Sequence, residues 1–440
     1  MLRFGKSPGI SEFQIVTTGV DEKRKKSGKK FSKRKDLSTE PNFKKPTLQP
    51  VWTDDEDYVP TEYVRPPPIF DINSYVSNRH DGTTDTDFDN PEYGRQLTAV
   101  SNILREDDSG HLPQSKAINI RRVFDVNRER VSMGAIVSVH FNPVCQMCLT
   151  GSADSTLAFF KVDGTENALL RDRVFENYPL SSAKFTPSGE RVVFTGNRNS
   201  FRIYDLQSGE ETRASPFIGS SVDDLLVQCE LSSGQPNIVA LGTTNRTIYL
   251  ADLRSLEKVS TLSTKAPLRS FCFLDSGAFL TTIDASGSVF VFDLRNRRPR
   301  VVHQWIDQAC TAGTAIASSS DGRWIACGSD CGYTNVYQCS KTMQSCTPEP
   351  DKSIANLQTA VDTIAFHPAS EMLCLSSSQR SASIRLYHLH GRHVFDNFPV
   401  RTGQLSSPTS VAFSPNGGYL CVGQSNGRAA LYHILHYMNY

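Results

Sequence analysis

From about residue 114 onward, hydrophobic and polar positions alternate in short segments that Gly, Pro, Asn and Asp residues separate. This pattern predicts short β-strands joined by turns. The segments repeat as a unit whose first strand ends in an aromatic residue followed by a turn. Clear copies of this first strand lie at Ser138–Pro143, Ser182–Gly189, Arg269–Phe273, Asp362–Pro368 and Thr409–Gly417.

The copies recur at a nearly constant interval. Phe141 and Phe185 are 44 positions apart, and Phe273 follows Phe185 by 88 positions, with a weaker copy near 222–230 between them. A further 44 positions lead to Ala317, and the last two intervals are slightly longer. A repeat of about 40 to 45 residues is typical of WD-type β-propellers. We count seven units, so the sequence predicts an all-β fold, a seven-bladed WD-repeat propeller over residues 114–440.

The two ends of the repeat region complement each other. The seventh unit stops after its third strand, Ala429–Leu435, whereas Ala117–Phe124 is a single strand before the first complete unit. If residues 117–124 form the outer strand of the blade with Tyr419–Leu435, the ring closes and no open sheet edge remains there.

Residues 1–113 have a different composition. An acidic patch at Asp54–Asp57 and three prolines at Pro66–Pro68 follow a basic tract within 23–35. Blocks of like charge cannot bury enough apolar area to offset the entropy of ordering, so we expect a largely disordered tail.

One short helix is predicted inside this tail, over residues 91–104. Pro91 suits a first helical position, and apolar residues follow at spacings of three and four. This stripe consists of Tyr93, Leu97, Val100 and Leu104. An isolated stripe needs a partner surface, so we expect the helix to form by docking, with Tyr93, Leu97 and Leu104 as contact residues.

The basic tract is the most specific signal in the tail. Its cations are Lys23, Arg24, Lys25, Lys26, Lys29, Lys30, Lys33, Arg34 and Lys35. Such a cluster predicts nuclear or nucleolar targeting, RNA contact, or both. The alternative is a solvated flexible segment without a function of its own.

Composition adds several exclusions. The 440 residues include 47 Lys and Arg against 46 Asp and Glu, so the net charge of +1 predicts no electrostatic function for the chain as a whole. No run of 18 apolar residues occurs, and the N-terminus has no apolar signal-peptide core, so we expect neither a membrane span nor secretion. The 11 Cys are irregularly spaced, which favours reduced, buried thiols.

Three local patterns resemble chemical motifs. Gly423–Gly427 matches the G-x-S-x-G pattern of hydrolases, but a strand follows it where a nucleophile elbow needs a helix, so a turn is predicted. Cys145 and Cys148 have metal-ligand spacing without a second pair nearby, and His388, His390 and His393 are more typical of packing or surface residues. We therefore expect no catalytic residues, no metal and no cofactor.

The detailed sequence resembles the U3 small nucleolar RNA-associated protein 18 family, nucleolar WD-repeat proteins of the small-subunit processome. The matching stretches extend over about three-quarters of the chain. They include Ile120–Glu129, Phe194–Phe201, Tyr204–Gly209, Val291–Arg295, Ala326–Ser329, Val394–Pro399 and Phe413–Tyr437, and in the tail Val51-Trp52 and the Tyr93 helix.

This resemblance implies a non-catalytic scaffold in nucleolar pre-rRNA processing and 18S rRNA maturation. The implied partners are the other UTP-B subunits, the U3 small nucleolar ribonucleoprotein and pre-rRNA. Some family members recruit the exosome helicase through a Leu-Phe motif that ends in Asp. The nearest segment here, with Ile69, Phe70 and Ile72, lacks the terminal carboxylate and the Leu-Phe pair, so it is a degenerate candidate for that contact.

Two other functions stay open at this stage. The chain could be an adaptor of another nuclear complex, such as a ubiquitin-ligase substrate receptor or a chromatin platform, which affinity purification would distinguish by its partner set. A propeller enzyme would need acid, base or metal residues at repeat-equivalent channel positions, and the sequence has none there. Among the predicted loops, the one with Arg295, Arg297 and Arg298 is the candidate partner interface. No small-molecule substrate is expected.

Overall fold

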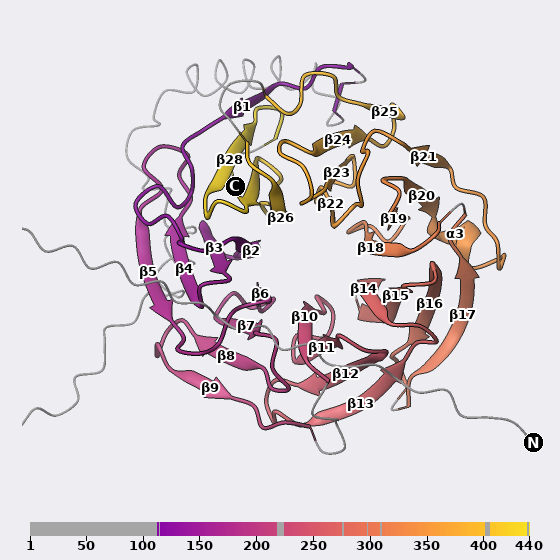
Figure 1. Ribbon diagram of the computed structural model, residues 1–440, viewed down its shortest axis with the longest axis horizontal. Coiled ribbons are helices and arrows are strands. Elements are labelled where there is room, and N and C mark those ends of the chain that lie inside the picture. Colours follow the sequence, from indigo (N-terminus) through magenta and orange to yellow (C-terminus); the bar gives the residue numbers. More distant parts are fainter. Residues whose placement is uncertain are drawn as a thin grey trace, which may run out of the picture. The chain divides into compact units, whose positions relative to one another are not determined.

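The structure is a computed structural model, and it describes residues 112–113, 115–217, 224–274, 277–296, 298–308, 310–400, 405–437 and 440. Within these ranges the strands form seven antiparallel sheets of four strands each. Figure 1 shows the sheets as blades around a central axis. The predicted seven-bladed propeller is therefore confirmed, whereas the predicted helix over 91–104 and the rest of the predicted tail before residue 112 lie outside the described residues.

Blades 1 to 3 contain twelve of the strands in chain order. Blade 1 consists of β2 (Ile136–Phe141), β3 (Met147–Ser152), β4 (Thr156–Lys161) and β5 (Leu169–Val174). Blade 2 consists of β6 (Ser182–Phe185), β7 (Arg191–Thr195), β8 (Arg202–Asp205) and β9 (Glu211–Arg213). Blade 3 consists of β10 (Leu226–Leu231), β11 (Ile238–Thr243), β12 (Thr247–Asp252) and β13 (Lys258–Ser263).

Blades 4 to 6 have the same strand order. Blade 4 consists of β14 (Leu268–Leu274), β15 (Phe279–Asp284), β16 (Ser288–Asp293) and β17 (Arg300–Ile306). Blade 5 consists of β18 (Gly313–Ser318), β19 (Trp324–Ser329), β20 (Thr334–Gln338) and β21 (Lys352–Ile354), with the short helix α3 (Cys339–Thr342) after β20. Blade 6 consists of β22 (Thr363–Phe366), β23 (Met372–Ser376), β24 (Ile384–His388) and β25 (His393–Val394).

Blade 7 joins the two ends of the described region. It contains β26 (Pro408–Phe413), β27 (Tyr419–Gln424) and β28 (Ala429–Ile434), and its outer strand is β1 (Ile120–Arg122). β1 pairs antiparallel with β28, with Ile120 opposite Ile434. The predicted closing strand is confirmed, although it is shorter than 117–124, because Ile118 bonds to the side chain of Asn397 in the segment after β25.

Two further contacts hold this closure. The buried Asn127 side chain donates to the Gly427 carbonyl at 2.7 Å and accepts from the Ala429 amide at 2.8 Å. The Tyr440 hydroxyl lies 2.9 Å from both the Asn142 and the Met147 carbonyl of blade 1, which share its proton, and it accepts from the Met147 amide at 3.1 Å.

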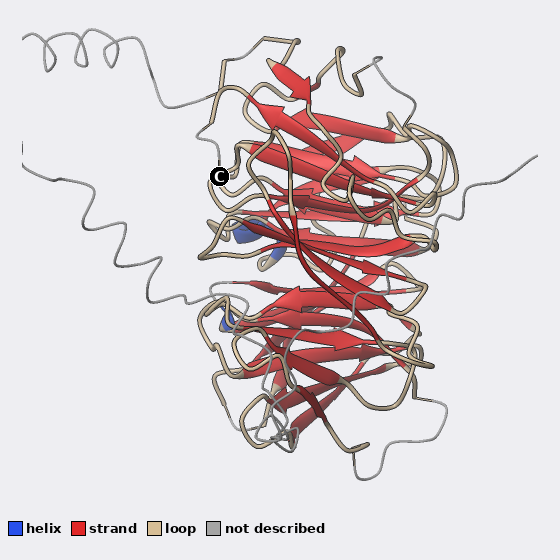
Figure 2. Cartoon of the chain, turned by 90° about the vertical axis from the view of Figure 1, so that its left-hand side faces the viewer, coloured by secondary structure: helices blue, strands red, loops and turns tan. Residues whose placement is uncertain are grey.

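The burial pattern explains why the strands have the sequences they have. Every residue of the second strands β3, β23 and β27 is buried, because neighbouring blades cover both faces of these strands. Such strands are nearly continuous in apolar residues and do not alternate. The outer strand β13, in contrast, is mostly exposed and alternates irregularly. In the side view of Figure 2 the strands run between two faces that loops cover.

The turns also account for specific residues. Gly417 in the turn after β26 has φ of +83°, and an added Cβ would lie 1.9 Å from Nε2 of His367 in the next-to-last blade. Only glycine has both the backbone freedom and the space that this turn requires. Within the described ranges, no helix has the length and hydropathy that crossing a bilayer requires.

Candidate functional site

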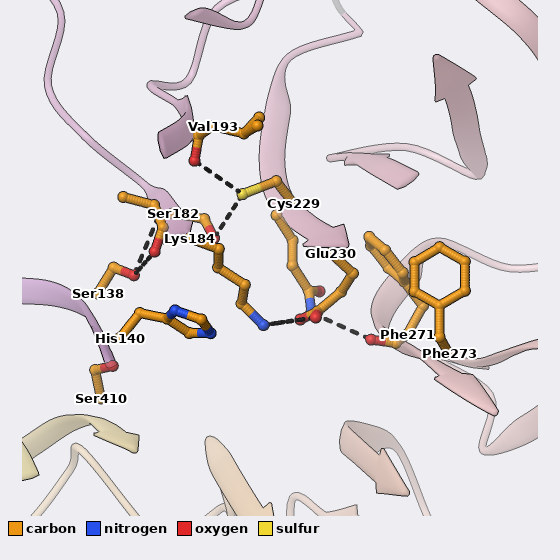
Figure 3. Close-up of polar contacts among 12 residues, drawn as sticks. Ser138, His140, Ser182, Lys184, Val193, Cys229, Glu230, Phe271, Phe273 and Ser410 are labelled. Carbon is orange, nitrogen blue, oxygen red and sulfur yellow. Dashed lines mark hydrogen bonds and ion pairs between the residues drawn. The ribbon is translucent and has the colours of Figure 1, made fainter. Parts of the chain in front are cut away.

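The central channel is the first place where a propeller could hold a chemical site. One position near the end of each first strand lies opposite the third residue of the second strand. In blades 1 to 7 it is occupied by His140, Lys184, Glu230, Cys272, Ala317, Ala365 and Ala412. Polar groups therefore occupy blades 1 to 4, and apolar groups occupy blades 5 to 7. Figure 3 shows His140, Lys184 and Glu230 side by side on β2, β6 and β10.

An ion pair joins two of these residues across blades 2 and 3. The Lys184 ammonium lies 2.5 Å from both carboxylate oxygens of Glu230 (Figure 3), and the two side chains are 28% and 19% exposed. Gln228 donates to the same carboxylate at 3.3 Å. Burial opposes the charge of Lys184, but the Glu230 carboxylate outweighs it and raises the pKa of Lys184 above its ordinary value. The two opposite charges of the pair thus neutralise each other within the channel.

His140 is neutral beside this pair. Burial, and to a lesser degree the positive charge of Lys184, lowers the pKa of His140 to about 3. Its Nδ1 accepts a hydrogen bond of 3.3 Å from the Phe185 amide. A base held at such a low pKa takes up protons poorly near neutral pH.

The hydroxyl groups of the innermost strands link neighbouring blades. Ser138 donates to the Ala183 carbonyl at 2.7 Å, Thr314 donates to the Val361 carbonyl at 2.7 Å, and Ser318 donates to the Phe273 carbonyl at 2.7 Å. Because Ser138 donates to a backbone carbonyl, it does not form the hydrogen bond to an imidazole that a nucleophilic serine needs. The geometry of the channel is that of a structural network.

The thiols have the same structural character. Burial raises the pKa of Cys229 to about 11 and that of Cys272 to about 12, so both are protonated thiols. Cys145 and Cys148 are buried, and Cys148 packs in the apolar cluster between blades 1 and 7. Among the described residues, no group of three or more His, Cys, Asp or Glu is arranged to hold a metal ion.

The remaining motif residues have packing or turn positions. Ser425 lies in the turn between β27 and β28, where its hydroxyl is 3.2 Å from that of Ser406. His388 is buried and accepts from the Gly391 amide at 2.8 Å, and His393 bonds to the Ser115 carbonyl at 2.9 Å. The turn and the packing histidines predicted from the sequence agree with these positions.

Most interface candidates predicted from the sequence lie outside the described residues. These are the nine cations between Lys23 and Lys35, the contact residues Ile69, Phe70 and Ile72, the helix residues Tyr93, Leu97 and Leu104, and Arg297. Their roles stay predictions.

The described part of the arginine loop gives a more specific picture. Arg295 makes a bidentate ion pair with Asp293, at 3.0 and 2.9 Å, and its guanidinium lies 4.9 Å from the ring centroid of Phe279. Arg298 is exposed and has no ion pair among the described residues. The loop borders a hollow of about 190 Å³ with Val259 of blade 3. Arg298 is therefore better placed than Arg295 to contact a partner.

The sequence-based expectation that no acid or base occupies repeat-equivalent channel positions is wrong, because His140, Lys184 and Glu230 lie at such positions in blades 1 to 3. Sequence reasoning therefore missed the Lys184–Glu230 pair. Each residue occupies the same position in its repeat, so a column of the aligned repeats would have shown adjacent opposite charges in blades 2 and 3. It also missed Arg380 and Arg385 in blade 6, which no repeat-based pattern identifies.

A match to a known protein family agrees with the propeller architecture. Residues 397–433, which include β26 and β27 and most of β28, match the family described as "WD domain, G-beta repeat". Together with the seven blades, this match defines the protein as a WD-repeat β-propeller.

More extensive similarity identifies a particular group within that class. A protein of Arabidopsis thaliana named U3 small nucleolar RNA-associated protein 18 homolog is 29% identical over 365 residues, which are 82% of this chain and 65% of that protein. A Mus musculus protein of the same name is 29% identical over 71% of this chain and 56% of its own length. The Saccharomyces cerevisiae U3 small nucleolar RNA-associated protein 18 is 29% identical over 73% of this chain and 61% of its own length.

Seven proteins with this name match the chain at 26 to 29% identity. The resemblance to the U3 small nucleolar RNA-associated protein 18 family that the sequence predicts is therefore confirmed. The chain spans between about half and two-thirds of the length of the first three of these relatives.

Proposed function

We propose that this protein is a non-catalytic scaffold of the small-subunit processome that is required for nucleolar pre-rRNA processing and 18S rRNA maturation. The observation that supports this most is the similarity to seven proteins named for association with the U3 small nucleolar RNA, which extends over most of the propeller. In this role the chain binds the U3 small nucleolar ribonucleoprotein and other UTP-B subunits, and pre-rRNA directly or through them.

The channel supports a role in binding over one in catalysis. Its titratable groups are a self-neutralised ion pair and a neutral histidine, and the hydroxyls of Ser138, Thr314 and Ser318 donate to backbone carbonyls. A propeller instead offers loop-built faces and blade edges, which suit simultaneous contact with several proteins.

The basic tract Lys23–Lys35 supports the proposed location in the nucleus and nucleolus. Nine cations in so short a segment suit recognition by nuclear import receptors and retention by RNA. Recruitment of the exosome helicase through Ile69–Ile72 is a further proposal, which a pull-down with the purified helicase would test.

Depletion in cells of the source organism tests the proposal. Small-subunit precursor RNA should accumulate unprocessed on a northern blot, with little change in large-subunit rRNA, and re-expression of the full chain should restore processing. Normal 18S rRNA after depletion would overturn it. Affinity purification of the tagged chain gives a second criterion: recovery of a ubiquitin ligase or chromatin complex without U3 RNA would favour the adaptor function.

A further inference from the structure

Blade 6 has an incomplete outer strand. β25 has two residues, fewer than any other outer strand: β1, β9 and β21 have three, and β5, β13 and β17 have six or seven. β25 pairs only with Tyr387 and His388 of β24. In the described part of the chain, no strand lies beside Ile384 and Arg385 at the start of β24, so a stretch of sheet edge is open there.

A groove occupies the place of the missing strand. It comprises a hollow of about 650 Å³ and two further hollows of about 420 and 410 Å³, all of which Asp396 borders. We call it the blade 6 groove and define it by Asn356, Arg380, Arg385, Val394, Asp396 and Pro399. The buried side chains of Leu357, Phe395 and Phe398 lie beneath it, and Val394 and Pro399 are half-buried at its surface.

Arg385 fills a backbone role at this open edge. Its guanidinium donates to the Ile384 carbonyl at 2.7 Å. Two residues further along β24, the Leu386 carbonyl accepts from the Phe395 amide at 2.9 Å. Carbonyls two residues apart point to the same side of a strand. The guanidinium therefore occupies the position that the N–H of an adjacent strand would take.

The charges around the groove favour an anionic partner. Cations at its border are Lys116, Lys352, Arg380, Arg385 and Arg392. Among the described residues only Arg392 of these has an ion pair, with Asp351 at 3.1 Å. Asp396 is the opposing charge at the centre of the groove.

We propose that the blade 6 groove is a docking site for an extended, acidic segment of a partner protein, which adds as a strand along the open edge of β24. A backbone N–H of this segment replaces the Arg385 guanidinium on the Ile384 carbonyl, and the guanidinium then binds a carboxylate of the segment. Affinity comes from the main-chain hydrogen bonds, and selectivity for acidic sequences comes from Arg380 and Arg385.

The geometry favours a peptide over RNA. An open strand edge offers alternating amides and carbonyls at peptide spacing, and the half-buried Val394 and Pro399 offer apolar surface for aliphatic side chains. The site does not depend on a role in ribosome biogenesis, because it follows from the edge and the charges of blade 6 alone.

A peptide selection on the purified full chain tests this inference. Phage-displayed random 12-residue peptides are selected on the wild type, and binding of the enriched peptides is then measured by fluorescence anisotropy. We expect sequences with Asp or Glu between aliphatic residues. Arg380→Glu and the double variant R380E/R385E should each weaken binding at least about tenfold, since each loses a charge-assisted hydrogen bond.

Two further variants separate docking from folding. Asp396→Lys removes the opposing charge and should tighten binding about threefold, an effect that misfolding cannot produce. Arg323→Glu in blade 5, whose side chain is 79% exposed, is the matched charge reversal and should leave binding unchanged.

The chemistry of the probe gives the last criterion. Alternate residues of a strand direct their backbone N–H groups to the same side. N-methylation of the residues whose N–H groups face β24 should therefore abolish binding of an enriched peptide, whereas N-methylation of the other residues should not. The inference is overturned if no acidic peptide is enriched, if binding does not depend on Arg380 and Asp396, or if an oligo(U) 12-mer competes for the groove better than any selected peptide.

Discussion

The Lys184–Glu230 ion pair allows a quantitative test of how the channel contributes to stability. In Glu230→Gln the shape of the side chain is kept, but the Lys184 ammonium, 28% exposed, loses its countercharge at 2.5 Å. Removing one partner of a buried pair lowers the free energy of unfolding by about 3 to 5 kcal/mol. Because both side chains are partly exposed, we expect a loss at the lower end, about 3 kcal/mol.

Removing both charges should be far less damaging. In K184M/E230Q no charge is left uncompensated, and the equivalent positions of blades 5 to 7 already hold Ala317, Ala365 and Ala412. We expect the double variant to lie within about 1 kcal/mol of the wild type, so that the coupling energy of the pair is about 2 kcal/mol or more.

Calorimetry can resolve these differences. For a domain of roughly 300 residues, 3 kcal/mol corresponds to a fall in Tm of about 5 °C, and 1 kcal/mol to less than about 2 °C. Scans at two rates separate thermodynamic from kinetic effects, because large domains often unfold irreversibly. Lys341→Met is the control: its pair with Asp351 is 3.9 Å long and the lysine is 55% exposed, so Tm should change by less than about 1 °C.

Two outcomes would refute the reasoning. Exposed ion pairs, which solvent screens, contribute about 0.5 kcal/mol to stability. If Glu230→Gln changes Tm by less than about 1 °C, the Lys184–Glu230 pair behaves like such an exposed pair. If the double variant is as unstable as the single one, the loss comes from packing and not from an uncompensated charge.

Further predictions concern pH, closure, the serine motif and location. Burial lowers the pKa of His140 to about 3 and that of His367 to about 4, so the unfolded chain binds about one more proton than the native one at about pH 6.5 and nearly two more at about pH 5. The stability from these neutral histidines is full above about pH 7.5 and falls as the pH drops, by up to about 2.7 kcal/mol per unit near pH 5, and His367→Gln should halve that slope in urea titrations. Asn127→Ala leaves the buried Ala429 amide of blade 7 without its partner, whereas the Gly427 carbonyl keeps the Ser132 amide at 3.2 Å. This should cost about 1 to 3 kcal/mol and expose residues 115–126 to limited proteolysis; an unchanged digest would contradict this. Ser425→Ala should rescue 18S rRNA processing as well as the wild type, and a failure of rescue with an intact fold would reopen an enzymatic role. Alanine at all nine cations of Lys23–Lys35 should shift a fluorescently tagged chain out of the nucleolus, and an unchanged nucleolar signal would make the tract a solvated segment only.

Much of the fold could be predicted because its determinants are local in sequence. Most first strands carry an aromatic residue at or near their end, of which Phe141 and Phe185 are buried in the structure, and the interval between these residues gives the blade count. The missing outer strand of the seventh unit then predicts the closure, because an open edge requires a partner. The role predicted for the nine tail cations and the helix predicted over 91–104 stay predictions, because both lie outside the described residues.

The candidate site was harder to predict because its contacts join separate blades. The Lys184–Glu230 pair spans 46 positions, and neither residue type is required by its own blade. The blade 6 groove depends on the length of β25. This outer strand pairs with β24 alone, so few contacts determine where it ends and its length is hard to predict from the sequence. Arg385 itself resembles any arginine on a strand until the open edge beside it is known.

The two regions differ in whether their polar groups are already satisfied. In the channel, Lys184 and Glu230 neutralise each other, and Ser138 donates to a carbonyl of the next blade, so binding any ligand there would first require breaking contacts that hold the ring together. At the edge of blade 6, the Arg385 guanidinium donates to the Ala382 and Ile384 carbonyls, its hydrogen-bond partners among the described residues. A docked strand could take over the Ile384 carbonyl and offer a carboxylate to the guanidinium, so that both groups would gain a stronger partner. Variants that reduce partner binding without reducing Tm should therefore lie around Arg380, whereas variants at Lys184 should lower both together.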